Sequence, residues 1–222
     1  MTLICATIAE DTVKKAVKAA KSLKCDVVEV RLDFLKDASE LDWLGRINKP
    51  VIVTCMPKWE GGRFGGTEGE RIGILEKSLK FADFVTIELK TDPGLRDELI
   101  ITARNRNVKV IIAHHDFENT PSSDEIMEVL EAEEDAGGDI AKVAYMPRSK
   151  KDVLSVLVAQ VNARLNIPVI ALSMGEMGRV TRVAGPMLGG FLMYAAASER
   201  KKTAAGQYTI KDMNMLRKIA WI

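Results

Sequence analysis

The sequence contains little histidine, cysteine or aromatic side chain, and neither sign of charge is in excess. Of its 222 residues, two are histidines, three are cysteines and 5% are aromatic. The 32 lysines and arginines nearly balance the 31 aspartates and glutamates, so the formal net charge is +1. A protein that binds nucleic acid by neutralising phosphates normally carries a basic excess. The charge balance therefore argues against a nucleic-acid partner.

Other absences concern disulfides and membranes. Cys5, Cys25 and Cys55 are odd in number and widely spaced, whereas disulfides and zinc sites favour paired or clustered cysteines, so we predict buried free thiols. No uninterrupted apolar run reaches the roughly 18 residues that a membrane span requires. The first residues also lack the basic and long apolar regions of a secretory signal. These features favour a cytoplasmic protein with no membrane partner.

Short β-branched runs alternate with longer amphipathic stretches along the whole chain. Apolar residues of the longer stretches recur at helical spacing, as at Val13, Ala16, Val17 and Ala20. The predicted strands are residues 3–8, 26–32, 51–55, 84–89, 108–113, 140–145, 169–172 and 190–194. The predicted helices are residues 11–23, 70–82, 94–106, 123–136, 150–163 and 210–219. Thr67 with Glu70 forms a capping-box pattern, and Ser122 or Ser123 is placed to cap the next helix.

Eight strand–helix units over residues 1–222 predict an α/β fold, a single-domain (β/α)8 TIM barrel. An open doubly wound sheet is the alternative, because alternation alone does not prove closure. Polar residues near the ends of several strands favour the barrel. Glu29, Arg31 and Asp33 share one strand face, and Thr86 and Glu88 share another. In a barrel these side chains face the interior near the mouth formed by the carboxyl ends of the strands, where active sites of this fold lie.

Lys142 lies in an almost wholly apolar strand. Burial removes the hydration of a lysine and favours its neutral amine, the nucleophile that forms a Schiff base with a ketone or aldehyde. The same lysine can instead merely neutralise Glu29 or Glu88, and its position alone does not decide between these roles.

The preceding strand ends in the only two histidines, His114 and His115. Successive strand residues point to opposite faces, so only one histidine is expected to face the barrel centre. A histidine beside a Schiff-base lysine can shuttle protons at neutral pH, and Glu88 on the adjoining strand can fix its tautomer. A metal site is the alternative, disfavoured by the opposed directions and the absence of a third histidine.

These residues bring the chain close to one family: it resembles the type I 3-dehydroquinate dehydratases, the Schiff-base-forming enzymes of the shikimate pathway. The resemblance follows family order over essentially the whole chain. It is carried by Glu29-Val30-Arg31-Leu32-Asp33, Glu60-Gly61-Gly62, Ile87-Glu88-Leu89, His115-Asp116-Phe117 with Thr120-Pro121, Asp139-Ile140-Ala141-Lys142-Val143-Ala144 with Met146-Pro147, Ser173-Met174-Gly175, Thr181-Arg182 and Gly206-Gln207.

The resemblance implies a syn elimination of water from 3-dehydroquinate, giving 3-dehydroshikimate without a metal or organic cofactor. Lys142 matches the lysine that forms an imine with the C3 ketone. His115 matches the histidine that assists imine formation and hydrolysis, takes the C2 proton and protonates the departing hydroxyl. Glu88 is matched to the acidic residue that orients the histidine.

The resemblance also implies a set of substrate-binding residues. Arg182 matches the arginine that pairs with the substrate carboxylate. The other contacts implied for the substrate and its pocket are Glu29, Arg31, Glu60, Thr203 and Gln207. Residues 198–207 are interpreted as a lid over the substrate.

Three positions depart from the family pattern. Met56 stands where many members carry an arginine, so that either Lys58 or Arg63 reaches into the pocket or the pocket is less positive. Thr203 stands where serine is common, and Ala205 where proline is common. These changes bear on binding affinity more than on the type of reaction.

The same barrel could serve two other functions, and its late apolar residues bear on assembly. A class I aldolase on the same barrel would need a phosphate site in the late loops, where the sequence offers Arg182 and Gln207 and no glycine-rich cradle. A binding or scaffold protein on a retained barrel would not need Lys142, His115 and Glu88 together. The late apolar residues 185–197 and Trp221-Ile222 exceed what one helix face requires, which favours packing inside the barrel, with a homodimer contact as the alternative.

Overall fold

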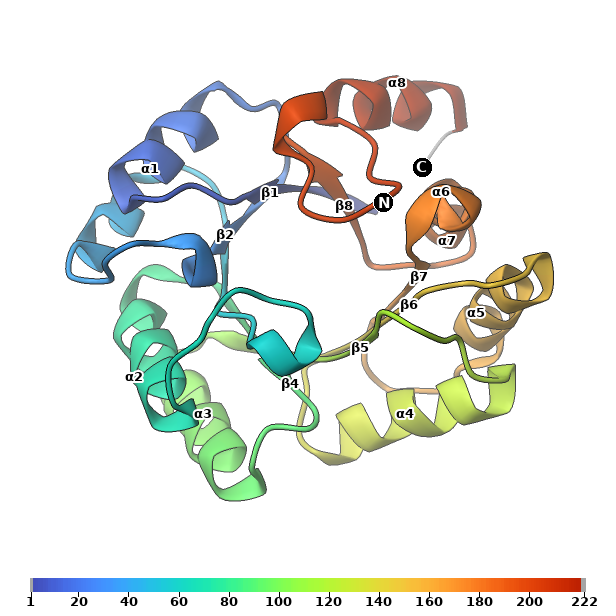
Figure 1. The fold of residues 1–222 in the computed structure, drawn as a ribbon, viewed down its shortest axis with the longest axis horizontal. Helices are drawn as coiled ribbons and strands as arrows, with labels where there is room; N and C mark the ends of the chain where they lie inside the picture. Colours follow the sequence, from blue (N-terminus) through green and yellow to red (C-terminus); the bar gives the residue numbers. More distant parts are fainter. Residues whose placement is uncertain (1, 221–222) are drawn as a thin grey trace.

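The computed structural model describes residues 2–220. Eight parallel strands stand in a ring, surrounded by helices (Figure 1). They are β1 (Leu3–Ile8), β2 (Val27–Arg31), β3 (Val51–Thr54), β4 (Phe84–Glu88), β5 (Lys109–Asp116), β6 (Ile140–Tyr145), β7 (Val169–Ser173) and β8 (Leu192–Ala196). Neighbouring strands pair in chain order from β1 to β7, and β8 pairs with β1. This order confirms the predicted barrel and excludes the open doubly wound sheet.

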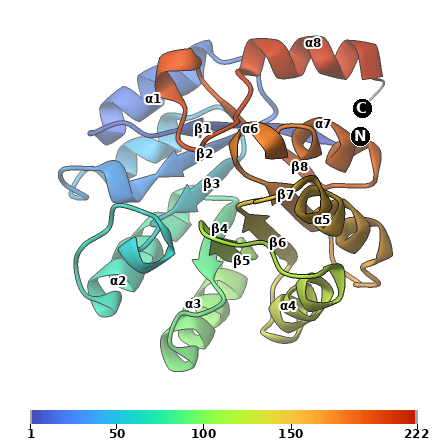
Figure 2. The same ribbon diagram turned by 45° about the vertical axis from the view of Figure 1, so that its right-hand side comes forward.

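Helices connect the strands and cover the outside of the barrel (Figure 2). They are α1 (Val13–Ser22), α2 (Glu68–Ser78), α3 (Pro93–Asn105), α4 (Ser123–Asp135), α5 (Lys150–Asn162), α6 (Gly175–Gly178), α7 (Thr181–Met187) and α8 (Ile210–Ala220). Both predicted caps are present, since Thr67 with Glu70 and Ser122 with Glu125 form capping boxes at α2 and α4. No helix within residues 2–220 is long and apolar enough to cross a membrane.

The second strand–helix unit differs from the prediction of eight regular units. Between β2 and β3 the described chain forms only 3-10 turns, Leu32–Phe34 and Leu41–Arg46. The apolar residues Leu41, Leu44 and Ile47 of this segment are spaced three apart and are buried. A three-residue repeat matches the three residues per turn of a 3-10 helix and not the 3.6 of an α-helix.

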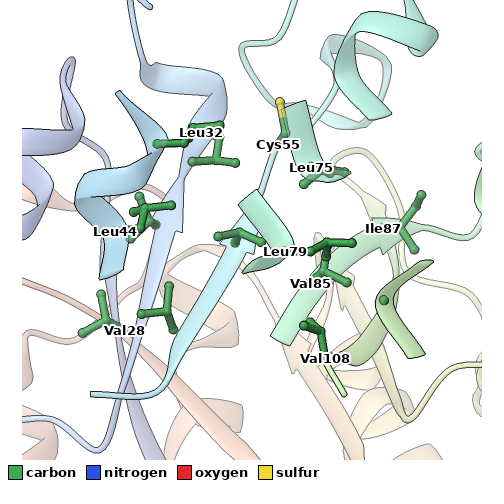
Figure 3. Close-up of a cluster of buried hydrophobic side chains, with 14 of the residues drawn as sticks. Val28, Leu32, Leu44, Cys55, Leu75, Leu79, Val85, Ile87 and Val108 are labelled. Atoms are coloured by element: carbon green, nitrogen blue, oxygen red, sulfur yellow. The ribbon is translucent and has the colours of Figure 1, made fainter. Parts of the chain in front are cut away.

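Two apolar layers determine where a ligand can enter. The outer layer lies between strands and helices, and Figure 3 shows part of it, including Val28, Leu44, Leu75 and Val85. Inside the barrel, Cys5, Ile52, Ile111 and Ile140 pack together and fill the half that contains the amino ends of the strands. Because strand residues alternate between the two layers, the polar residues further along each strand face the interior near the other end.

The strand boundaries place both histidines on regular structure. β5 extends to Asp116, beyond the predicted end at residue 113, and therefore includes His114 and His115. β8 begins and ends two residues later than predicted, at Leu192 and Ala196. The thiols of Cys5 and Cys55 are buried and that of Cys25 is only half-buried, and all three are free.

Candidate active site

Lys142 projects from β6 into the interior at the mouth of the barrel. It is buried, and Ala144, Leu172 and Tyr194 line the same cavity. Its Nζ lies 4.3 Å from the centroid of the Tyr194 ring. Burial lowers the pKa of the Lys142 amine, the positive charge of Arg31 lowers it further, and Glu29 acts in the opposite direction. The lysine therefore holds a larger fraction of nucleophilic neutral amine than an exposed lysine does.

The two histidines diverge as the strand alternation predicts. His115 lines the cavity beside Lys142, and its Nδ1 lies 3.2 Å from Glu60 Oε2, so that Nε2 remains for a ligand. His114 points to the other face of β5, where its Nδ1 lies 3.1 Å from the Tyr145 hydroxyl. Burial lowers the pKa of His115 well below its usual value, and the nearby charges of Lys142 and Arg31 act in the same direction. His115 is thus a neutral imidazole at neutral pH.

The expectation that Glu88 orients the histidine is wrong: Glu60 does so. The register aligns Glu88 with Ala113, two residues before His115, and so places its carboxylate deeper in the barrel. Glu60 instead follows β3 in the 3-10 turn Lys58–Glu60 and reaches the histidine from the loop. Strand alternation points only to carboxylates on adjoining strands, and the match to the family pattern gave the orienting role to Glu88 and only a pocket contact to Glu60.

Glu88 forms an ion pair with a residue that the sequence interpretation did not single out. Arg71 of α2 is fully buried, and its Nη1 lies 2.5 Å from Glu88 Oε2. The same guanidinium donates to the Cys55 carbonyl oxygen at 3.2 Å and to the Thr91 hydroxyl at 2.8 Å. This pair fastens α2 to the ends of β3 and β4. Burial raises the pKa of Glu88 to about 7, although Arg71 opposes that shift.

Two glycines allow the Glu60 turn to sit against the cavity. Gly61 has a φ of +82°, and a Cβ there would lie 2.3 Å from the Phe117 ring. A Cβ on Gly62 would lie 2.0 Å from the Met56 carbonyl oxygen. Because no side chain fits at either position, the turn can approach closely enough for Glu60 to be buried behind His115. Burial and the charge of Glu88 raise the pKa of Glu60 to about 9.

Residues of β2 and β3 form a polar wall of the cavity. Arg31 binds Asp33 through two hydrogen bonds, Nε to Oδ1 at 2.8 Å and Nη2 to Oδ2 at 2.7 Å. Glu29 Oε1 accepts the Thr54 hydroxyl at 3.0 Å. These bonds fix the side chains in place and leave polar atoms available on the cavity side.

Arg182 and the loop after β8 form the opposite wall. Arg182 comes from α7, is buried, and its Nε has no hydrogen-bond partner among the described residues. Burial lowers the pKa of its guanidinium to about 10, so that the group remains cationic at neutral pH. Gln207 Oε1 accepts the Thr203 backbone N–H at 2.9 Å, which ties together the two loop residues predicted to touch the substrate.

The cavity together with its open mouth encloses about 650 Å³. Seven of the nine predicted site residues line it, while Glu60 lies behind His115 and Glu88 lies below. The seven predicted residues that line the cavity are Glu29, Arg31, His115, Lys142, Arg182, Thr203 and Gln207.

Thr7 and Tyr194, which were not predicted, also line the cavity, and each has a buried hydroxyl without a partner in the described chain. Strand alternation could have found both, since Thr7 shares a face with Cys5 and Tyr194 with Leu192. Unpaired buried polar atoms around one cavity indicate a polar ligand.

Met56 lines the cavity without an arginine taking its place. Arg63 lies over the Phe34 ring, 4.2 Å from its centroid, outside the cavity. Lys58 extends toward Gly65, where a Cβ would lie 2.8 Å from its Nζ. The pocket is therefore the less positive of the two expected forms.

Within residues 2–220, no group of three or more histidine, cysteine, aspartate or glutamate side chains is placed to hold a metal ion.

Comparison with known families agrees with this geometry. The model of the family type I 3-dehydroquinase matches residues 4–220. The chain belongs to this family. Among its relatives, the 3-dehydroquinate dehydratase of Desulfotalea psychrophila is 35% identical over 214 residues, which cover 95% of this chain and 94% of that protein. The enzyme of the same name from Methanocaldococcus jannaschii is 37% identical over 219 residues, covering 95% and 96% of the two chains.

Solved structures of type I 3-dehydroquinase relatives share the barrel. The 3-dehydroquinate dehydratase of Geobacillus kaustophilus superimposes with a TM-score of 0.91 at 26% identity, covering 100% of this chain and 91% of that one. The type I enzyme of Clostridium difficile, solved with covalent modified comenic acid, gives a TM-score of 0.90 at 29% identity over 99% and 92% of the chains.

Proposed function

We propose that this type I 3-dehydroquinase is a 3-dehydroquinate dehydratase, a hydro-lyase that forms 3-dehydroshikimate through a Schiff base on Lys142. The observation that carries the proposal is the buried amine of Lys142 beside the neutral imidazole of His115, in a cavity that also contains Arg182, whose Nε has no hydrogen-bond partner among the described residues. The names of its relatives supply the substrate.

Imine formation is the first step. The neutral Lys142 amine attacks the C3 ketone to give a carbinolamine. Uptake of one proton from solvent and loss of the former ketone oxygen as water leave a protonated imine, and this proton is released again when the product imine is hydrolysed. This cation is an electron sink that makes the neighbouring C2–H more acidic, so that a weak base suffices to remove the proton. The depressed pKa of Lys142 favours the attack because it increases the neutral fraction.

His115 transfers the proton. Its Nε2 takes the C2 proton, which gives an enamine, and then returns it to the C1 hydroxyl as that group departs with the C–O electron pair as water. Hydrolysis of the conjugated imine releases 3-dehydroshikimate and regenerates the amine. Glu60 holds the imidazole through Nδ1 and so directs Nε2 toward the substrate.

The remaining residues bind the substrate. Arg182 pairs with the carboxylate, because a buried guanidinium whose Nε lacks a partner in residues 2–220 gains most from an anion. Glu29, Arg31, Thr203 and Gln207 contact the hydroxyl groups. Glu88 contributes as the partner of Arg71 that supports the floor of the site.

The absorbance of the conjugated enone product tests the activity. We expect purified protein mixed with 3-dehydroquinate to increase this absorbance, and Lys142→Met to abolish the increase. Retro-aldol cleavage without dehydration would favour the aldolase alternative. Absence of any turnover by the folded wild-type protein would contradict the proposed function.

We also propose that the enzyme is a cytoplasmic homodimer, because its free thiols suit a reducing compartment and one helical face is apolar. Of the late apolar stretch, β8 is buried in the barrel, whereas Met187 and Leu188 of the α7 end are 60% and 43% exposed. Leu154 and Val158 of the adjacent α5 are 59% and 43% exposed. Trp221 and Ile222 lie outside the described residues. Light scattering is expected to give twice the chain mass, and Leu154→Glu to halve it; a wild-type monomer would contradict the dimer.

A further inference from the structure

One seam of the barrel lacks strand pairing. β7 and β8 are neighbours in the ring, but within the described chain they share no ladder. At the start of β7, the Phe191 N–H donates to the Val169 carbonyl oxygen at 3.0 Å. Further along β7, side chains take the places of the missing strand partner. The Ala171 N–H donates to Gln160 Oε1 at 3.3 Å, and the Ser173 N–H donates to Thr181 Oγ1 at 2.9 Å. The seam is thus filled by α5 and α7.

Thr181 is at the point where this seam reaches the active site. Its side chain is 1% exposed, and its hydroxyl accepts from Ser173 N–H while donating to the Gly178 carbonyl oxygen at 2.8 Å. One hydroxyl therefore joins the end of β7 to the turn between α6 and α7. Without it, a buried N–H and a buried C=O lose their partner together.

Gly178 brings this turn close enough for the bond. A Cβ on Gly178 would lie 2.5 Å from both the carbonyl carbon and the oxygen of Ser173, so that only glycine fits there. The close approach of Gly178 and the Thr181 hydroxyl are two separate contacts that fix the start of α7 against the end of β7.

Arg182 is the next residue after Thr181 in the chain. It lines both the small cavity in the seam and the active-site cavity, so its side chain passes through the seam to reach the interior. The described chain gives its Nε no hydrogen-bond partner. The direction of its guanidinium is therefore set by the backbone from which it comes and by packing in the seam.

We propose that Thr181 is a positioning residue, which replaces the missing strand pairing at the end of β7 and thereby directs Arg182 into the active site. The part that concerns substrate rests on the proposed function, in which Arg182 binds the carboxylate. Thr181 itself does not line the active-site cavity and acts through its neighbour.

The test compares Thr181→Val, which removes only the hydroxyl hydrogen bonds, with Thr181→Ser, which keeps them. Ser78→Ala is the matched control, since Ser78 is also fully buried and its hydroxyl donates to a backbone carbonyl oxygen, that of Leu75, far from the cavity. Unliganded crystal structures of the three variants and of the wild type show where Arg182 lies. Kinetics with 3-dehydroquinate then show whether binding or chemistry has changed.

We expect the Arg182 guanidinium to leave the cavity in Thr181→Val and to stay in the other two variants. KM should rise on the order of tenfold in Thr181→Val, with kcat within about threefold of wild type. Thr181→Ser should remain near wild type, and Ser78→Ala should lower only stability. In an Arg182→Ala background, Thr181→Val should reduce kcat/KM no further, because both changes remove the same contact.

An Arg182 that is unmoved in Thr181→Val, or a Thr181→Val effect that adds fully to that of Arg182→Ala, would overturn the positioning role. If the wild-type protein does not turn over 3-dehydroquinate, the proposed function fails, and the unliganded structures still decide whether Thr181 positions Arg182.

Discussion

His114 and His115 are adjacent in sequence and have the same side chain, yet β5 places them in different surroundings. His115 meets Glu60 and the cavity, whereas His114 meets Tyr145 on the outer face. A pair of alanine substitutions separates the two roles. Because a positioned acid–base group contributes roughly 10²- to 10⁴-fold to a rate, His115→Ala should lower kcat by at least about a hundredfold. His114→Ala should change kcat by less than about threefold, since it touches no reacting atom. Steady-state kinetics at neutral pH check the ranking, and the reverse order would refute the assignment of faces.

The outward histidine should make stability depend on pH. Burial lowers the pKa of His114 to about 4 from the 6.5 of an exposed histidine. Below pH 6.5 the unfolded chain therefore takes up a proton that the folded chain does not, and stability decreases as pH falls toward 4. By pH 5 this linkage amounts to about 2 kcal/mol. Urea unfolding at pH 7 and pH 5 should show a smaller loss for His114→Phe than for the wild type by about that amount. Equal losses would show that His114 does not titrate in this way.

Glu60 and Glu88 should respond differently to the same substitution. Glu60→Gln weakens a hydrogen bond to the catalytic histidine, so kcat should fall roughly ten- to a hundredfold with little loss of stability. Glu88→Gln breaks the buried pair with Arg71, so it should lower the free energy of unfolding by about 3 kcal/mol or more. Paired kinetics and denaturant titrations measure both effects. A larger kcat loss for Glu88→Gln at full folding would restore the role first expected for that residue.

Residue types and strand alternation were enough to predict Glu29, Arg31 and Lys142 and the split of the two histidines. The other cavity residues, Arg182, Thr203 and Gln207, were predicted only from the resemblance to the family. Residue types and alternation could not identify the partner of His115, because Glu60 comes from a loop whose path depends on Gly61 and Gly62 fitting against Phe117 and Met56. Arg71 was missed for a similar reason: an arginine in an amphipathic helix is usually exposed, and only tertiary packing buries this one against Glu88.

At the scale of elements, the strands followed their apolar runs closely, whereas the late helices were missed. α6 has four residues, and α7 has seven and contains Gly185 and Pro186, so neither offers a helical apolar repeat long enough to recognise. The seam between β7 and β8, which lies beside these helices, is not marked by any sequence pattern either. It depends on which strand edges remain unpaired after the barrel has closed.

The loop after β8 offers a test of an element's role in binding. Gly206 has a φ of +75°, and a Cβ there would lie 2.1 Å from the Gly175 carbonyl oxygen. Gly206→Ala should displace Thr203 and Gln207 from the cavity and raise KM on the order of tenfold, from the strain of such a contact. Gly189→Ala is the control, because its φ of +93° imposes a similar backbone cost with nothing within 4 Å of the added carbon. Kinetics and thermal melts of both variants check the prediction, and equal KM values would contradict it.

At the scale of the whole molecule, the nearly neutral net charge conceals a charged interior. Glu29, Arg31, Glu88, Lys142 and Arg182 are all buried in one barrel whose surface charges nearly cancel. Desolvation makes each of these charges sensitive to its neighbours and lowers the pKa of the central lysine. Such an interior suits a small anionic keto acid and not a polyanion, in agreement with the family to which the chain belongs.

Lys142 acts covalently in the proposed mechanism, and borohydride reduction in the presence of 3-dehydroquinate can trap the imine that this role requires. Reduction converts an imine into a stable secondary amine that intact mass and peptide mapping can locate. We predict one adduct per chain, on Lys142, and none in Lys142→Met or without substrate. An adduct on another lysine, or turnover without any adduct, would contradict the Schiff-base mechanism.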